Sequence, residues 1–120
     1  MPQLETVIRK YLEAWNDTDA THRRARIAEL FTADCSYVDP LAAVAGRDGM
    51  DALIAGVQQQ FPGLRFTLNG NVDAHHDQAR FVWHAGPPGA NEPAVIGFDV
   101  IELEGARIKR VLGFLDKVPA

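Results

Sequence analysis

The chain has 120 residues, and 12 Lys and Arg residues against 16 Asp and Glu residues give it a formal net charge of −4. The length fits one domain over residues 1–120, the 47% of hydrophobic residues excludes disorder, and the acidic balance argues against a nucleic-acid or membrane-surface partner. With one cysteine, Cys35, no apolar run of about 20 residues and no basic leader, we expect a cytoplasmic domain without a disulfide or a cysteine-based zinc site.

Two helices are predicted before residue 32. In the first, residues 4–15, apolar side chains recur at three- and four-residue steps, which is typical of a helix with one buried face. The second runs to about Phe31, and Thr18 or Asp19 can cap its start. Its arginines suggest either a phosphate site or, as the acidic net charge favours, a solvated face: Arg23, Arg24 and Arg26.

A short strand and a third helix follow. The strand, residues 35–38, is predicted to end at Asp39-Pro40, because proline cannot donate a hydrogen bond to a sheet. After a loop over residues 41–46, a helix buries a stripe from Met50 to Phe61 and ends at Pro62-Gly63.

The rest of the chain is predicted to form strands. Alternating apolar and polar residues over 64–75 indicate one long strand that is weak or bent at Gly70 and turns at residues 76–78. Strands are also predicted over 78–85, 94–104 and 107–118. Three helices, an antiparallel four-strand meander and one early strand indicate an α+β fold. A strongly curved sheet, able to bend at Gly97 and Gly113, would enclose a cavity against the helices.

Asp99 departs most from its surroundings, since residues 95–101 are otherwise apolar on both faces of the strand. A carboxylate there is costly unless it is paired or protonated. If the preceding loop is centred near Gly89 and Ala90, Arg80 lies opposite Asp99, and His84 lies on the same face. A paired Asp99 would be structural or part of a charged binding site, whereas an unpaired one would be a proton donor.

Two other polar residues are candidates for chemistry. Tyr11 lies on the buried stripe of the first helix, where its hydroxyl needs a partner. Asp39, with Tyr37 two residues earlier on the same face, either bonds its own backbone in a turn or acts as a base. The residue types of His75-His76-Asp77 suit a metal, but strand neighbours point to opposite faces, which favours a solvated turn.

Five segments resemble the nuclear transport factor 2-like superfamily, most closely its SnoaL-like branch, which is named after a polyketide cyclase. The segments are VIRKYLEAWN (7–16), ELFTAD (29–34), YVDP (37–40), GFDVIEL (97–103) and the run from Arg107-Ile108 through GFLD (113–116). The resemblance covers nearly the whole chain. It implies a cone-shaped fold with a strongly curved, mostly antiparallel sheet on about three N-terminal helices, an interior pocket for a small molecule, and a homodimer formed through the sheet.

Ketosteroid isomerase is the nearest mechanistic match within that superfamily. The resemblance assigns its helix tyrosine to Tyr11, its general base before a proline to Asp39, and its protonated aspartic acid to Asp99. Polyketide cyclases similarly use a late-strand aspartate as acid and base, at a position like Asp99. Arg80 and His84 are polar where the isomerase pocket is apolar, and this difference favours a smaller or more polar ligand.

The sequence therefore predicts an isomerase or aldol-type cyclase that acts on a carbon acid without a metal or cofactor. Asp39 would remove a proton next to a carbonyl, while Tyr11 and a neutral Asp99 donate to the enolate oxygen, and His84 could replace the base. The residues expected to bind substrate are Arg80, His84, Tyr37, Val82 and Leu112. The alternatives are a non-catalytic ligand-binding or interaction module, in which Arg80 and Asp99 form a structural pair, and an assembly domain that uses the outer face of the sheet.

Overall fold

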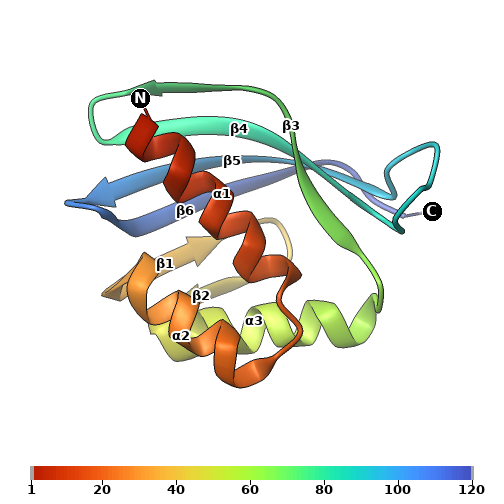
Figure 1. Cartoon of the computed structure of the whole chain (residues 1–120), viewed down its shortest axis with the longest axis horizontal. Helices are drawn as coiled ribbons and strands as arrows, with labels where there is room; N and C mark the ends of the chain where they lie inside the picture. The colour runs from red at the N-terminus through yellow and green to blue at the C-terminus, as the bar shows by residue number, and fades with distance from the viewer. Residues whose placement is uncertain (1, 120) are drawn as a thin grey trace.

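The computed structural model describes residues 2–119, which form three helices and six strands (Figure 1). In chain order the elements are α1 (Pro2–Asn16), α2 (Ala20–Leu30), β1 (Phe31–Val38), β2 (Ala43–Ala45), α3 (Gly46–Gln60), β3 (Arg65–His75), β4 (Gln78–Gly86), β5 (Val95–Glu104) and β6 (Arg107–Lys117). The predicted α+β class is confirmed.

The helices form where the spacing of the apolar residues predicts them. The side chain of Asp19 accepts a hydrogen bond from the backbone N–H of His22 at 2.9 Å, so Asp19 is the N-cap of α2. In α3, Met50 and Ile54 are buried as expected, whereas Phe61 follows the last turn and is 36% exposed. None of these helices, within residues 2–119, has the length and apolar character needed to cross a membrane.

The arginines of α2 are not one solvated face. Arg23 is 4% exposed, and its Nε donates to Asp51 of α3 at 2.7 Å. Arg26 pairs with Asp17 at 2.9 Å, and the exposed Arg24 also reaches Asp51 at 3.2 Å. The solvated-face prediction was wrong for Arg23, because its carboxylate partner lies on another helix, and the cluster holds α2 against α3.

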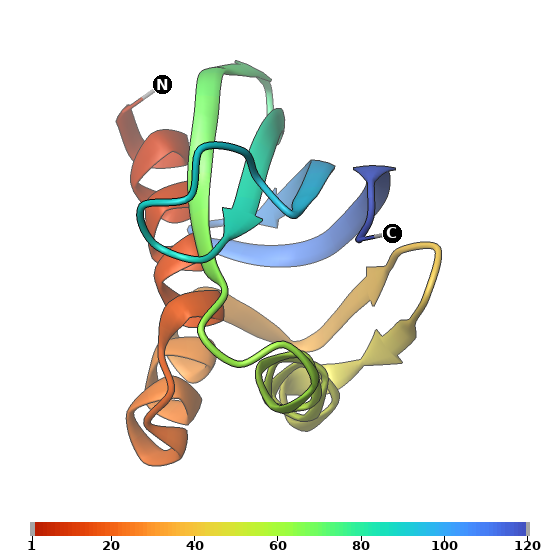
Figure 2. The same cartoon turned by 90° about the vertical axis from the view of Figure 1, so that its right-hand side faces the viewer.

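The sheet has the strand order β2-β1-β6-β5-β4-β3. β1 is parallel to β6, and every other neighbouring pair is antiparallel. β2 was not predicted, and β1 begins at Phe31 rather than at Cys35. Figure 2 shows the sheet curving around the side on which α1 and α3 lie. The last strand, β6, lies inside the sheet between β1 and β5.

The predicted bend in β3 is confirmed at Gly70. Its φ of +81° lies in the left-handed region that glycine adopts without steric cost, and the pairing with β4 shifts register between Asn69 and Asp73. Large, fully buried side chains fill the space between the helices and the concave face of the sheet: Tyr11, Phe31, Ile8, Ile27, Met50, Ile54, Ile101, Ile108 and Val111.

The pairing of β4 with β5 differs by one residue from the predicted register. Phe81, and not Arg80, lies opposite Asp99. The hairpin loop is centred on Ala90, and not between Gly89 and Ala90 as expected, so the strands pair one residue out of the predicted register. A slip of one residue moves every side chain of a strand to the other face of the sheet. The side chains that share the face of Asp99 are therefore apolar ones such as Trp83, and the predicted Arg80–Asp99 pair does not form.

Candidate functional site

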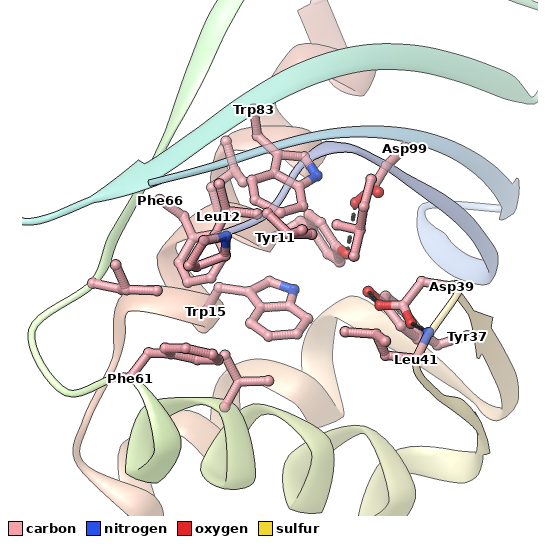
Figure 3. Close-up of a pocket in the computed structure, with 16 residues that line it drawn as sticks. Tyr11, Leu12, Trp15, Tyr37, Asp39, Leu41, Phe61, Phe66, Trp83 and Asp99 are labelled. Carbon is pink, nitrogen blue, oxygen red and sulfur yellow. Dashed lines mark hydrogen bonds between the residues drawn. The ribbon is translucent and has the colours of Figure 1, made fainter. Parts of the chain in front are cut away.

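A cavity of about 410 Å³ lies between α1, α3 and the concave face of the sheet (Figure 3). It is lined by Tyr11, Leu12, Trp15, Tyr37, Asp39, Leu41, Val57, Phe61, Leu64, Phe66, Trp83, Val95, Asp99, Leu115, Val118 and Pro119. The titratable groups of this lining are two phenols and two carboxyls, with no lysine, arginine or histidine among the described residues. A ligand therefore meets acids and hydroxyls on one wall and hydrocarbon elsewhere.

Tyr11 and Asp99 meet at this wall although 88 residues separate them in sequence. The phenolic Oη of Tyr11 donates a hydrogen bond to Oδ2 of Asp99 at 3.0 Å. The two residues are 1% and 2% exposed. The bond gives each buried polar group a partner, which is why a tyrosine can occupy the buried stripe of α1.

The environment of Asp99 raises its pKa from 3.8 to about 6. Burial is the largest cause, because it disfavours the charged form, and the negative charge of Asp39 acts in the same direction. Hydrogen bonds from Trp83 and Tyr11 act in the opposite direction. None of the ion pairs among the described residues includes Asp99. The carboxyl can thus gain and lose a proton near neutral pH, where acid–base catalysis works best.

The bond between Tyr11 and Asp99 can run in either direction. An ionised Asp99 accepts a hydrogen bond from the Tyr11 hydroxyl. A protonated Asp99 can instead donate a hydrogen bond to the Tyr11 oxygen. In the second case the phenolic proton is free to turn toward a ligand. Burial, followed by the Asp99 charge, raises the pKa of Tyr11 well above its usual value, so this phenol stays protonated and remains a donor.

Asp39 is held in a fixed orientation at the end of β1. Its Oδ1 accepts the backbone N–H groups of Leu41 and Ala42, each at 2.8 Å, and its Oδ2 accepts the Tyr37 hydroxyl at 2.6 Å. Burial is the largest cause of a raised pKa for Tyr37, which is therefore a steady donor. The turn interpretation of Asp39 is correct, and the same carboxyl also lines the cavity.

Gly113 of β6 separates the two carboxyls. It pairs with Asp99 across the strands, and a Cβ at this position would lie 3.0 Å from Oδ1 of Asp99 and 3.2 Å from Cβ of Asp39. The sequence identified Gly113 only as a place where the strand could bend. Its structural role is to leave space between two acids, and no local sequence signal shows that.

Four of the five predicted substrate-binding residues do not line the cavity, and Tyr37 is the one that does. Arg80 is exposed on the outer face, where its Nε pairs with Asp73 at 3.1 Å. Val82, His84 and Leu112 alternate with buried neighbours and lie on that outer face too, opposite Phe98, Ile96 and Val100 respectively. The one-residue register error accounts for Arg80, Val82 and His84.

Aromatic rings that the sequence pattern did not identify as site residues form part of the lining. The rings of Trp15, Phe66 and Trp83 follow one another with neighbouring centroids 5.2 Å apart, and Trp15 lies 6.1 Å from Tyr37. Their spacing in sequence is that of ordinary core residues, so periodicity could not separate a cavity wall from filled core. Over the part of the chain that the structure describes, no group of three or more His, Cys, Asp or Glu side chains could hold a metal ion.

Three helices on a curved, open, mostly antiparallel sheet form the fold of nuclear transport factor 2-like proteins, as in a solved structure from Mesorhizobium loti that is 22% identical, with a TM-score of 0.72 over 96% of this chain and 92% of that one. Residues 8–111 match the model of the SnoaL-like domain, and the chain belongs to this family. The predicted resemblance is confirmed. No curated protein matches the chain.

Solved structures show the same fold. A proposed isomerase of the SnoaL-like family from Agrobacterium tumefaciens is 38% identical, with a TM-score of 0.91 over 97% of this chain and 99% of that one. A proposed SnoaL-like polyketide cyclase from Jannaschia sp. is 22% identical, with a TM-score of 0.74 over 95% and 85% of the two chains. A ketosteroid isomerase-like protein from Catenulispora acidiphila, solved with trimethylamine, is 22% identical, with a TM-score of 0.72 over 89% and 82%. The last two show the fold alone.

Proposed function

We propose that the protein is an enzyme that enolises a carbonyl compound, as an isomerase or an aldol-type cyclase. The observation that carries this proposal is the wall formed by Tyr11, Asp39 and Asp99 in a cavity that is otherwise apolar. Removing a proton next to a carbonyl and returning it elsewhere needs a base, an acid and donors to the oxygen, and these side chains supply all three.

Asp39 is the base in this proposal. Two backbone N–H groups fix its Oδ1 and the Tyr37 hydroxyl is bound to its Oδ2, so the carboxyl keeps one orientation in the cavity wall. In this proposal the second lone pair of Oδ2 takes the proton. The α-carbon's C–H bond breaks, its proton passes to Asp39, and the bonding pair forms the C=C bond of the enolate. Negative charge then collects on the former carbonyl oxygen.

Tyr11 and Asp99 stabilise that charge. An apolar ligand in the cavity displaces water and deepens the burial of Asp99, which raises its pKa further and favours the protonated acid. Tyr11 and the protonated Asp99 then direct hydrogen bonds at the former carbonyl oxygen, which is the atom on which negative charge develops. In an isomerisation, Asp39 returns the proton to another carbon and the carbonyl re-forms. In a cyclisation, the enolate carbon attacks a second carbonyl carbon, the π bond of that carbonyl breaks, and the alkoxide that forms takes the proton back from Asp39.

The lining also bears on the size and charge of the substrate. Arg80 and His84 lie on the outer face, so the reason for expecting a smaller or more polar ligand no longer holds. Two carboxyls without a facing cation repel carboxylates and phosphates. We therefore expect an uncharged, largely apolar ring compound with one reactive carbonyl.

A non-catalytic role in binding an amine is the second candidate. Aromatic rings such as Trp15 and Trp83, together with the two carboxyls, are the groups that surround alkylammonium ions in aromatic cages. The related protein from Catenulispora acidiphila was solved with trimethylamine. Binding of alkylammonium ions in preference to phenols, without proton exchange of any ketone, would favour this role.

The homodimer stays a prediction, with the outer face of the sheet as its expected interface. Phe114 and Val38 on this face are 57% and 47% exposed, and the rings of Phe98 and Phe114 lie edge to face at 6.0 Å. A mass of twice 13.2 kDa in sedimentation equilibrium would support it.

Deuterium exchange of α-protons in a panel of cyclic ketones, followed by NMR, tests the proposed enzyme without knowledge of its substrate. Asp39→Asn should slow exchange by about 10²–10⁴-fold, the usual contribution of a general base. The amide oxygen can still accept from Leu41 and Ala42, so the turn should survive. Asp73→Asn, at an exposed aspartate of the outer pair, is the matched control and should exchange at the unaltered rate. Unchanged exchange in Asp39→Asn would remove Asp39 as the base.

A further inference from the structure

The indole ring of Trp83 lies directly over Gly97 of β5, and no residue other than glycine at position 97 would leave room for it. The two residues are direct partners across the β4–β5 ladder. A Cβ on Gly97 would lie 1.9 Å from Cζ2 and 2.1 Å from Cε2 of the indole, far inside any tolerated contact. Glycine is required here for close approach, and its φ is not in the left-handed region.

The indole that lies over Gly97 is directed at Asp99. Asp99 is two residues further along β5, on the same face, which is the diagonal neighbour that a long side chain on β4 can reach. Figure 3 shows the indole nitrogen of Trp83 on the side of its ring that faces the Asp99 carboxyl. Trp83 is 8% exposed and packs against Phe66, so the ring has little freedom to turn away.

We propose that Gly97 and Trp83 form a positioning device for Asp99: the glycine leaves room for the indole, and the indole N–H holds the carboxyl in one orientation. An indole N–H can only donate, so it occupies a lone pair of Asp99 in both protonation states. A proton that arrives on Asp99 must then take a site that the indole leaves free, such as Oδ2 beside the Tyr11 oxygen. Trp83 is thus a positioning residue that acts through Asp99.

The groups around Asp99 support this assignment. The titratable side chains that face it are Tyr11 from α1 and Tyr37 and Asp39 from β1 and its end, while β4 and β6 present Trp83 and Gly113. Neither Tyr11 nor Tyr37 carries charge near neutral pH, and the charge of Asp39 opposes ionisation of Asp99. Among these neighbours, the indole N–H and the Tyr11 hydroxyl are the groups that stabilise the carboxylate.

The test replaces the N–H while keeping the shape of the ring. 3-Benzothienylalanine at position 83 puts sulfur in place of the indole N–H, and the Asp99 carboxyl is titrated by ¹³C NMR in the full chain, with its signal assigned by its loss in Asp99→Asn. A hydrogen bond to a charged group is worth about one pH unit of titration midpoint, so the pKa of Asp99 should rise by about one. Gly97→Ala should raise it too, because the methyl group displaces the indole.

Phe66→Leu is the matched control, because it loosens the packing against Trp83 without removing a donor. Because the N–H is kept and only its packing is loosened, Phe66→Leu should move the Asp99 midpoint by less than the benzothienyl substitution does. An unmoved midpoint in the benzothienyl protein overturns the proposal, and so does an equal rise in Phe66→Leu, since the ring would then act only by filling space. The titration needs no substrate, so its outcome is independent of whether the cavity enolises ketones.

Discussion

Two buried aspartates, one in the helical layer and one in the sheet, are held in opposite ways. Asp51 of α3 is 8% exposed and receives the guanidinium groups of Arg23 and Arg24. Asp99 of β5 is 2% exposed and accepts a hydrogen bond from the neutral Tyr11 hydroxyl, with the indole that we propose as a second donor beside it. The first carboxylate has its charge matched by cations, and the second has hydrogen bonds but no opposite charge.

The difference shows how one fold separates a structural acid from a titratable one. A facing cation favours the ionised state of a carboxyl, and here it also links two helices. Neutral donors orient a carboxyl without an opposite charge, so the carboxyl can still bind and release a proton. Burial without a cation raises the pKa of Asp99 to about 6, and perturbed pKa values of this kind cluster at functional sites. The comparison leads to three predictions about stability and ligand binding.

The largest expected effect follows from removing the cation of the structural acid. Arg23→Ala leaves Asp51 buried with only the exposed Arg24 nearby, and a broken buried pair costs about 3–5 kcal/mol of unfolding free energy. Urea unfolding at pH 7 measures this loss. Arg24→Ala, at a side chain that is 72% exposed, is the control and should cost less than about 1 kcal/mol. Equal losses in the two variants would contradict the assignment of Arg23 as the structural partner.

The second prediction concerns the pH dependence that Asp99 gives to stability. Because its pKa is higher in the folded chain, about 6 against 3.8, the folded state binds the proton more tightly. Its stabilising contribution is complete below pH 3.8 and is lost as pH rises through about 6. The loss amounts to about 3 kcal/mol at 1.36 kcal/mol per pKa unit.

Asp99→Asn should remove this component of the pH dependence. The difference in unfolding free energy between the variant and the unaltered protein should change by about 2 kcal/mol between pH 4 and pH 7, in favour of the variant at the higher pH, because the full 3 kcal/mol is reached only below pH 3.8. Urea unfolding at several pH values measures it. Parallel curves for the two proteins would mean that the pKa of Asp99 is the same in the folded and unfolded chain, and would contradict this prediction.

The same comparison shows what could be read from the sequence. Asp99, Tyr11 and Asp39 were found because each breaks an apolar pattern or precedes a proline, and such exceptions are visible in one dimension. The fold class followed from the order of the helices and strands and from the motif resemblance. Arg23 was misassigned because its partner, Asp51, is a tertiary neighbour, and no periodicity reports which face of α2 meets α3.

The register of β4 against β5 could not be settled from the sequence. β5 is apolar on both faces, so its pattern does not show which face joins Ala79, Phe81 and Trp83 of β4, and the loop centre was the remaining guide. The structure pairs Phe81 with Asp99 and places Ala79, Phe81 and Trp83 on the buried face. The close approach at Gly97 was also out of reach, because it depends on the ring of Trp83 turning along the strand.

The smallest expected change tests whether the spacing of the two cavity acids matters. Gly113→Ala places a methyl group 3.0 Å from Oδ1 of Asp99 and 3.2 Å from Cβ of Asp39, so the carboxyls must shift by a few tenths of an ångström. Overpacking of this kind costs about 1 kcal/mol of unfolding free energy. Because the shift is concentrated on the ligand wall, we expect the affinity for a phenol such as 2-naphthol to fall by about tenfold, which 1.4 kcal/mol would produce.

Gly56→Ala, on an exposed helical position with no atom near the new methyl group, should leave that affinity unchanged. Calorimetry measures the two affinities. If they are equal for Gly113→Ala and Gly56→Ala, Asp39 and Asp99 do not act together on one ligand. The comparison between the structural Asp51 and the cavity wall would then depend on Asp99 alone.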